Sequence, residues 1–192
     1  VYFNDTTQEN AAGIMMYLTR NITLENNEIY NANTGIFDKG AGQFNTHRFN
    51  YIHDVRTSGI LKACFGSDVA YGGNPPGCYN LDIYQNIIVT DGIADQGNSG
   101  IGITGTTVYT DFEVWNNVIY NAEYGLAGSV NSSGFRAWNN IIYLLGSNGR
   151  AYAGVLLNSP VMNWNAYYND ATPNWQTDTG TYTTLSSWQS AT

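Results

Sequence analysis

Two short sequence marks alternate along this chain, and they constrain its fold more than any other feature. The first is a glycine followed by an aliphatic residue, found at Gly13, Gly35, Gly59, Gly100, Gly125 and Gly154. The second is an asparagine between these glycines, found at Asn27, Asn50, Asn86, Asn117, Asn140 and Asn165. Subtracting residue numbers gives glycine intervals of 22, 24, 41, 25 and 29 residues. The chain therefore repeats a unit of about 22–25 residues, with insertions in the longer intervals.

The residues around each asparagine follow the periodicity of β-strands. Segments such as "LDIYQ" before Asn86 and "FEVWN" before Asn117 alternate apolar and other side chains. This alternation is typical of a strand with one buried face. A second short apolar run follows each asparagine, and a third begins at each glycine. Helices are disfavoured because Asn, Gly and β-branched residues weaken them. A propeller is disfavoured because each of its blades needs about 40–45 residues, more than this repeat provides.

Three short strands per repeat predict an all-β fold, a right-handed parallel β-helix of about six coils with a loop insertion at 64–78. The coils would stack about 4.8 Å apart, so that equivalent residues form columns. We expect the asparagines to bond to one another along the stack and to adopt left-handed bends. We expect the glycines to occupy bends that need positive φ.

The chain also resembles a known family. The segments "NNEIYNANTGIFDKG" and "FNYIHDVRTSGI" resemble right-handed parallel β-helix repeat proteins of the pectate-lyase-like superfamily, and the resemblance covers about residues 12–170. We expect residues 1–170 to form the helix and 171–192 an extended C-terminal segment. The tail "GTYTTLSSWQSAT" is similar to a segment that follows such helices in secreted bacterial proteins and usually continues further, which favours a fragment of a longer helix.

Composition narrows the classes of function. The net charge is −8, which disfavours a nucleic-acid partner because phosphate binding needs a basic face. No run of 18 apolar residues occurs, so membrane insertion is not expected. Charged residues make up only 11%, a profile that suits extracellular β-rich proteins. Cys64 and Cys78 would close a disulfide loop of about 15 residues, with free thiols as the alternative. We therefore expect an extracellular or cell-surface protein.

One predicted column offers a surface for a polysaccharide partner. Two residues before successive asparagines stand Arg48, Tyr84, Trp115 and Trp138. In stacked strands the three aromatic residues would form a continuous exposed row. Sugar rings have an apolar C–H face that packs on aromatic rings and hydroxyls that reach polar neighbours. The alternative is that this row packs only structurally.

The few cations cluster, and this cluster is a candidate active site. Four of the seven Lys and Arg residues fall within residues 39–62, namely Lys39, Arg48, Arg56 and Lys62. Asp38 and Lys62 share one slot in successive repeats, so we expect them to be stacked neighbours that can form a salt bridge. We expect His53 to lie near this pair and the loop between the two cysteines to fold over the same cations. The alternative is a set of solvated ion bridges. His47 falls at an inward slot and is interpreted as a core or loop histidine.

The family resemblance implies a chemistry for that cluster. In β-helix polysaccharide lyases a cation or metal neutralises a uronate carboxylate, a base removes the adjacent proton, and the leaving oxygen departs by β-elimination. Lys39 or Lys62 would be the base, and Arg56 would hold the carboxylate. No cofactor is certain, and Ca²⁺ is left open through acidic loop residues such as Asp68. The alternatives are a non-catalytic adhesive module and a filament subunit that stacks on itself through its helix ends.

Overall fold

The computed structural model shows an all-β protein whose strands run parallel in two sheets. It describes residues 11–64, 78–91, 98–105, 109–128, 132–144, 149–154, 161–169, 174–177, 180–182, 184, 186–187 and 190. One sheet has six strands and the other twelve, and they are called here the short sheet and the long sheet. Every strand pairing is parallel except that between β17 and β18. The all-β, parallel part of the prediction is confirmed.

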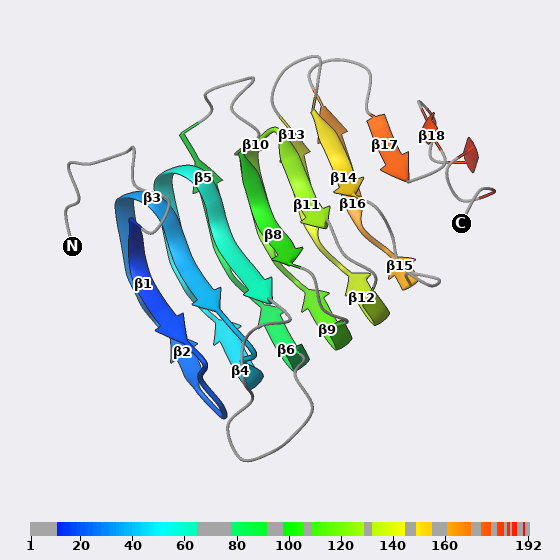
Figure 1. Ribbon diagram of the computed structural model, residues 1–192. Helices are drawn as coiled ribbons and strands as arrows, with labels where there is room; N and C mark the ends of the chain where they lie inside the picture. The colour runs from blue at the N-terminus through cyan, green and yellow to red at the C-terminus, as the bar shows by residue number, and fades with distance from the viewer. Residues whose placement is uncertain are drawn as a thin grey trace.

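The short sheet takes one strand from each repeat, and these strands lie side by side in Figure 1. Its members in spatial order are β2 (Thr23–Glu25), β4 (Gln43–Arg48), β6 (Cys78–Tyr84), β9 (Tyr109–Trp115), β12 (Ser132–Trp138) and β15 (Val161–Asn163). The predicted alternation places Leu81, Ile83, Phe112 and Val114 on its buried face, where none is more than 3% exposed. Period-two hydrophobicity therefore determines which face of these strands is buried.

The long sheet has two arms that share the long strands β3 (Glu28–Lys39) and β5 (Tyr51–Cys64). Residues 51–55 of β5 pair with β7, whereas residues 58–64 pair with β8. The first arm continues through β7 (Ile87–Thr90), β10 (Val118–Ala122), β13 (Ile141–Leu144) and β16 (Ala166–Asn169). The second continues through β8 (Ser99–Gly105), β11 (Tyr124–Gly128), β14 (Arg150–Gly154), β17 (Asn174–Thr177) and β18 (Gly180–Tyr182). β1 (Ala12–Tyr17) pairs with β3. The boundary expected at residue 170 stays a prediction.

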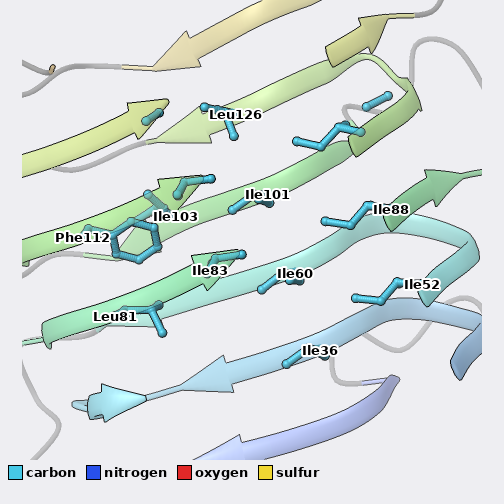
Figure 2. Packing of buried hydrophobic residues seen from close by; sticks show 14 of the residues in the cluster. Ile36, Ile52, Ile60, Leu81, Ile83, Ile88, Ile101, Ile103, Phe112 and Leu126 are labelled. Atoms are coloured by element: carbon cyan, nitrogen blue, oxygen red, sulfur yellow. The ribbon is translucent and has the colours of Figure 1, made fainter. Parts of the chain in front are cut away.

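The core consists of aliphatic columns contributed by successive repeats. Figure 2 shows Ile36, Ile60 and Ile101 following one another along the second arm, and all three are at most 1% exposed. The glycine before each of these residues allows close packing, since a Cβ on Gly35 would overlap the Cγ2 methyl group of Ile52 and the carbonyl of Gly59. The expectation that these glycines need positive φ was wrong, because the described glycines with positive φ are Gly40, Gly105 and Gly134.

The recurring asparagines form a hydrogen-bonded ladder. From Asn27 to Asn140, each Nδ2 donates to the Oδ1 of the asparagine in the next repeat, for example Asn86 to Asn117 at 3.0 Å and Asn117 to Asn140 at 3.0 Å. The backbone N–H of Asn117 also donates to Asn140 Oδ1, at 3.0 Å. The predicted ladder is confirmed. The expectation that these asparagines adopt left-handed φ was wrong, because the residue before each of them does so instead.

The predicted disulfide between Cys64 and Cys78 is present, and both cysteines are buried. It joins the end of β5 to the start of β6, and therefore links the long sheet to the short sheet. The loop between the two cysteines, residues 65–77, lies outside the described residues. The expectation that this loop covers the cation cluster therefore stays a prediction.

Candidate functional site

The bend that leads from the short sheet into the long sheet displays one exposed side chain per repeat. These six residues are called here the corner row: Asn26, Phe49, Gln85, Asn116, Asn139 and Trp164. All six have left-handed backbones, with φ between 54° (Gln85, Trp164) and 57° (Asn26). The ladder asparagine that follows each of them lies deeper: the four central ones are buried, and Asn27 and Asn165 are half-buried. The sequence signal for this row is the residue immediately before each ladder asparagine.

Two members of the corner row are aromatic, and their backbone conformation disfavours them. Asparagine tolerates the left-handed region because its short polar side chain can bond locally, whereas a bulky residue at positive φ is a true outlier. Phe49 has φ 55° and is 44% exposed, and Trp164 has φ 54° and is 81% exposed. Such strain costs on the order of 1 kcal/mol. The Trp164 ring is too exposed for burial to offset this cost, whereas Phe49 contacts neighbouring side chains. Trp164 combines this backbone with the most exposed ring among the exposed large hydrophobic residues described, which points to a use for that ring at the surface.

Beside the corner row runs the predicted aromatic row, in which neighbouring rings stack. The Tyr84 and Trp115 centroids are 4.3 Å apart at an interplanar angle of 12°, and those of Trp115 and Trp138 are 5.1 Å apart at 2°. Arg48 continues the row, with Nη1 donating to the Tyr84 hydroxyl at 2.8 Å and Nη2 2.6 Å from Glu25 Oε2. Because the ring faces cover one another, the row presents ring edges rather than open faces to a ligand.

The two rows meet at Phe49, and together they are called here the corner surface. The Phe49 ring meets the Tyr84 ring edge-on at 6.1 Å, and the Arg48 guanidinium carbon lies 5.5 Å from the Phe49 ring centroid. Half-buried Asp82 stands on the outer side of the aromatic row, next to Glu113 on the adjacent strand. Burial and the charge of Glu113 raise the pKa of Asp82 above its usual range. Ionic groups therefore border the corner surface, whereas the corner row itself is uncharged.

The predicted active-site residues fall in two environments. Asp38 and Lys62 are paired in register on β3 and β5, and Lys62 Nζ lies 2.7 Å from Asp38 Oδ1. This confirms that they are stacked neighbours, and both are 0% exposed. Lys39 Nζ lies 5.7 Å from the Phe37 ring centroid, and the Lys39 and Arg56 side chains are half-buried. The structure therefore encloses Lys62 and leaves Lys39 and Arg56 at the surface.

His53 belongs to the other arm of the long sheet. It pairs with Val89 on β7, and its ring stacks against Tyr30 with centroids 5.2 Å apart. The Nδ1 atom of His53 lies 2.8 Å from Asp54 Oδ2. Lys62, in contrast to His53, is paired with a residue of β8, Ile103. Because β7 and β8 are in different arms, the structure does not bring His53 next to the buried lysine.

The Asp38–Lys62 pair belongs to an enclosed group that sequence reasoning found only in part. This core polar cluster consists of Asp38, Asn45, His47 and Lys62, none more than 1% exposed. Asn45 Nδ2 donates to Asp38 Oδ2 at 3.0 Å, and His47 Nε2 lies 3.4 Å from the same oxygen. The inward placement predicted for His47 is confirmed. Its approach to Asp38 was missed because the two residues come from strands of different sheets.

The charges of the cluster favour an ionised Asp38. Burial raises the pKa of this carboxyl, but contact with His47 and the positive charge of Lys62 together outweigh burial, so the pKa lies below its usual value. Lys62 Nζ also donates to the carbonyl of Gly40 at 3.0 Å. Among the described residues, neither ring nitrogen of His47 makes a hydrogen bond of good geometry. Nε2 faces Asp38 Oδ2 at 3.4 Å. A buried histidine whose polar contact among the described residues is one carboxylate oxygen of an ion pair is a feature that packing alone does not explain.

Metal and membrane features are not found in the described part of the chain. Across those residues, no group of three or more His, Cys, Asp or Glu side chains is placed to hold a metal ion. Asp68, the acidic residue considered for Ca²⁺, lies outside the described residues. Over the same described ranges, no helix has the length and apolarity to cross a membrane. Comparison with family models, curated proteins and solved structures gave no match to this chain.

Proposed function

We propose that this protein is a secreted right-handed parallel β-helix of about six coils that binds a polysaccharide along its corner surface. The helical winding is supported by parallel pairing of each short-sheet strand with its equivalent in the next repeat, as in the register of Leu81 with Phe112. It is also supported by the asparagine ladder, which needs consecutive repeats in direct contact. A resemblance to pectate-lyase-like proteins is consistent with this winding and is part of the proposal.

The corner row carries the functional proposal, because it joins strained, exposed aromatic rings to a line of exposed amides. A sugar ring presents a C–H face that packs on Trp164 or Phe49 and hydroxyls that exchange hydrogen bonds with the amides of Gln85, Asn116 and Asn139. With strands about 4.8 Å apart, the two aromatic residues are about 19 Å apart along the row, a span that suits an extended polymer. The row is uncharged, which favours a neutral polysaccharide over a uronate polymer.

Binding is favoured over cleavage by the burial of Lys62. A base that removes a proton from a polymer must reach that polymer, and Lys62 is 0% exposed and paired with Asp38. Lys39 and Arg56 remain at the surface, so β-elimination is kept as an outcome of the tests rather than as the proposal. The extracellular location is supported by the Cys64–Cys78 disulfide, since such bonds persist in oxidising compartments.

The test is binding to a panel of soluble and insoluble polysaccharides, with three variants of the same kind. Phe49→Asn and Trp164→Asn should each lower the affinity for the captured polysaccharide about tenfold, the effect of losing roughly 1.4 kcal/mol of ring contact. Phe44→Asn is the matched control. Like Phe49, Phe44 is partly exposed (42%), has a left-handed backbone (φ 54°) and lies under an arginine. It differs in position, because Phe44 lies near the start of β4 and Phe49 just after the end of that strand.

The proposal predicts unchanged affinity for Phe44→Asn. Equal losses in all three variants, or none in any of them, would remove the corner surface as the binding site. Absorbance of unsaturated products should be followed in the same samples with alginate, pectate and glycosaminoglycans. A signal that Lys39→Ala abolishes would replace binding by lyase activity as the function.

A further inference from the structure

The core polar cluster holds an amine and a carboxyl group in contact inside the protein. Lys62 Nζ lies 2.7 Å from Asp38 Oδ1, and the carbon bonded to that oxygen, Cγ, is the atom that an amine would attack. Both side chains are 0% exposed, and they come from register-paired positions of β3 and β5. Fixed contact of two reacting groups removes most of the entropic barrier to their reaction.

Gly42 keeps this contact tight. A Cβ on Gly42 would lie 2.6 Å from Lys62 Nζ and 2.8 Å from Asp38 Oδ1. The backbone of Gly42 therefore packs directly against the pair, and a larger residue would push between the two groups. Exclusion of bulk water also favours condensation, because it limits the back reaction.

We propose that Lys62 and Asp38 condense into an intramolecular isopeptide bond that joins β3 to β5. One proton first passes from the ammonium group of Lys62 to Asp38 Oδ1, which gives a neutral amine and a neutral carboxylic acid. Nζ then attacks Cγ, and the C–N bond forms. The Cγ–Oδ1 bond breaks, and Oδ1 leaves as water with a second proton from Nζ. The third proton remains on the new amide, so atoms and charge balance without an oxidant or a cofactor.

Two neighbours are placed to assist at the other carboxyl oxygen. Oδ2 becomes negatively charged when Nζ attacks, and Asn45 Nδ2 already donates to Oδ2 at 3.0 Å. A donor aimed at a developing oxyanion stabilises the tetrahedral intermediate. His47 Nε2 lies 3.4 Å from Oδ2 and can lend a proton to this oxygen and take it back. This role accounts for a buried histidine that lacks a closer partner among the described residues.

Condensation also removes an electrostatic cost. Two buried charges are each expensive to desolvate, whereas one amide is neutral and needs only ordinary hydrogen bonds. The carbonyl formed from Cγ and Oδ2 would keep the hydrogen bond from Asn45, and the new N–H would keep the carbonyl of Gly40 as its acceptor. The product therefore retains the polar contacts of the cluster.

The test is the intact mass of the purified full chain, measured after reduction and denaturation. The proposal predicts a mass lower than that of the sequence by one water. Because a cyclised aspartate also loses one water, proteolysis followed by tandem mass spectrometry must then find a branched peptide that joins Lys62 to Asp38. A chain of full mass, or a loss of water that maps to any other residue, overturns the proposal. Both measurements use the unaltered protein, so they do not depend on a variant that folds.

Four variants sharpen the assignment. Lys62→Met should have the full mass calculated from its own sequence, because it lacks the reacting amine. Lys39→Met is the matched control, since Lys39 and Lys62 are the two lysines of the chain, and it should still lose one water. Asp38→Asn should react with loss of ammonia instead of water, which gives the same final mass as the cross-linked natural chain. His47→Phe should react at least tenfold more slowly over a time course of freshly purified protein. An unchanged rate in His47→Phe would remove the proton-carrying step.

Discussion

At the scale of the residue, the positions that point to function are those where the left-handed backbone favours Asn but the sequence has a large aromatic residue. Four members of the corner row are Asn or Gln, whereas Phe49 and Trp164 place large rings at φ 55° and 54°. The sequence predicted a bend at each repeat, but it assigned the left-handed backbone to the ladder asparagine instead of its predecessor. Periodicity locates a bend to within one residue, and only hydrogen bonding within the structure decides which of two adjacent residues adopts the unusual φ.

Trp164→Asn should raise the free energy of unfolding by about 0.5–1 kcal/mol, because it relieves a bulky left-handed residue that is 81% exposed. Urea denaturation of the natural chain and the variant measures the difference. The same variant should lose polysaccharide affinity, so stability and binding should change in opposite directions. A variant that is less stable than the natural chain would show that the ring packs usefully where it stands.

Asp82→Asn should stabilise the protein at neutral pH, because burial and the nearby charge of Glu113 raise the pKa of Asp82 in the folded state. A raised pKa means that the fold favours the protonated form, so ionised Asp82 lowers the stability at every pH above its folded pKa. The gain should be largest at neutral pH and should vanish below the unfolded value of 3.8. Thermal denaturation of both proteins between pH 3 and pH 7 tests this; a gain that grows towards low pH would contradict it.

At the scale of the element, the sequence predicted strands well because their signal is local. Alternation in "LDIYQ" and "FEVWN" gives the buried face of β6 and β9, and the repeated asparagines give the ladder. The role of the glycines was misassigned because crowding comes from neighbouring repeats, as when Ile52 packs against Gly35. The enclosed contact of His47 with Asp38 was also beyond local patterns, since it depends on two sheets facing one another.

Asn117→Ala should cost about 2–4 kcal/mol of unfolding free energy, because it removes hydrogen bonds to both neighbouring repeats and leaves buried partners unpaired. Asn116→Gly is the matched control one residue earlier, at an exposed position with φ 56° that glycine adopts without strain. The control should change stability by less than about 0.5 kcal/mol. Equal effects of the two substitutions in guanidinium denaturation would contradict a ladder that stabilises the stack.

At the scale of the whole molecule, the stacked repeats turn single side chains into long surfaces and long internal columns. The corner row has one member for each of the six strands of the short sheet, which Figure 1 shows side by side. The aromatic row, with Arg48, runs across four of these strands, from β4 to β12. The Asp38–Lys62 pair and the Cys64–Cys78 disulfide reinforce neighbouring strands around β5. The predicted self-stacking through helix ends stays a prediction, and light scattering across a range of concentrations would detect it.

The most direct measurement of the central claim is a crystal structure of the protein with an oligosaccharide of the polysaccharide that it captures. We expect sugar rings along the bend between the two sheets, with one ring packed on Trp164 and hydroxyls within hydrogen-bond distance of Asn139 and Asn116. Sugar bound instead beside Lys39 and Arg56, with the bend left bare, would contradict binding along the corner surface.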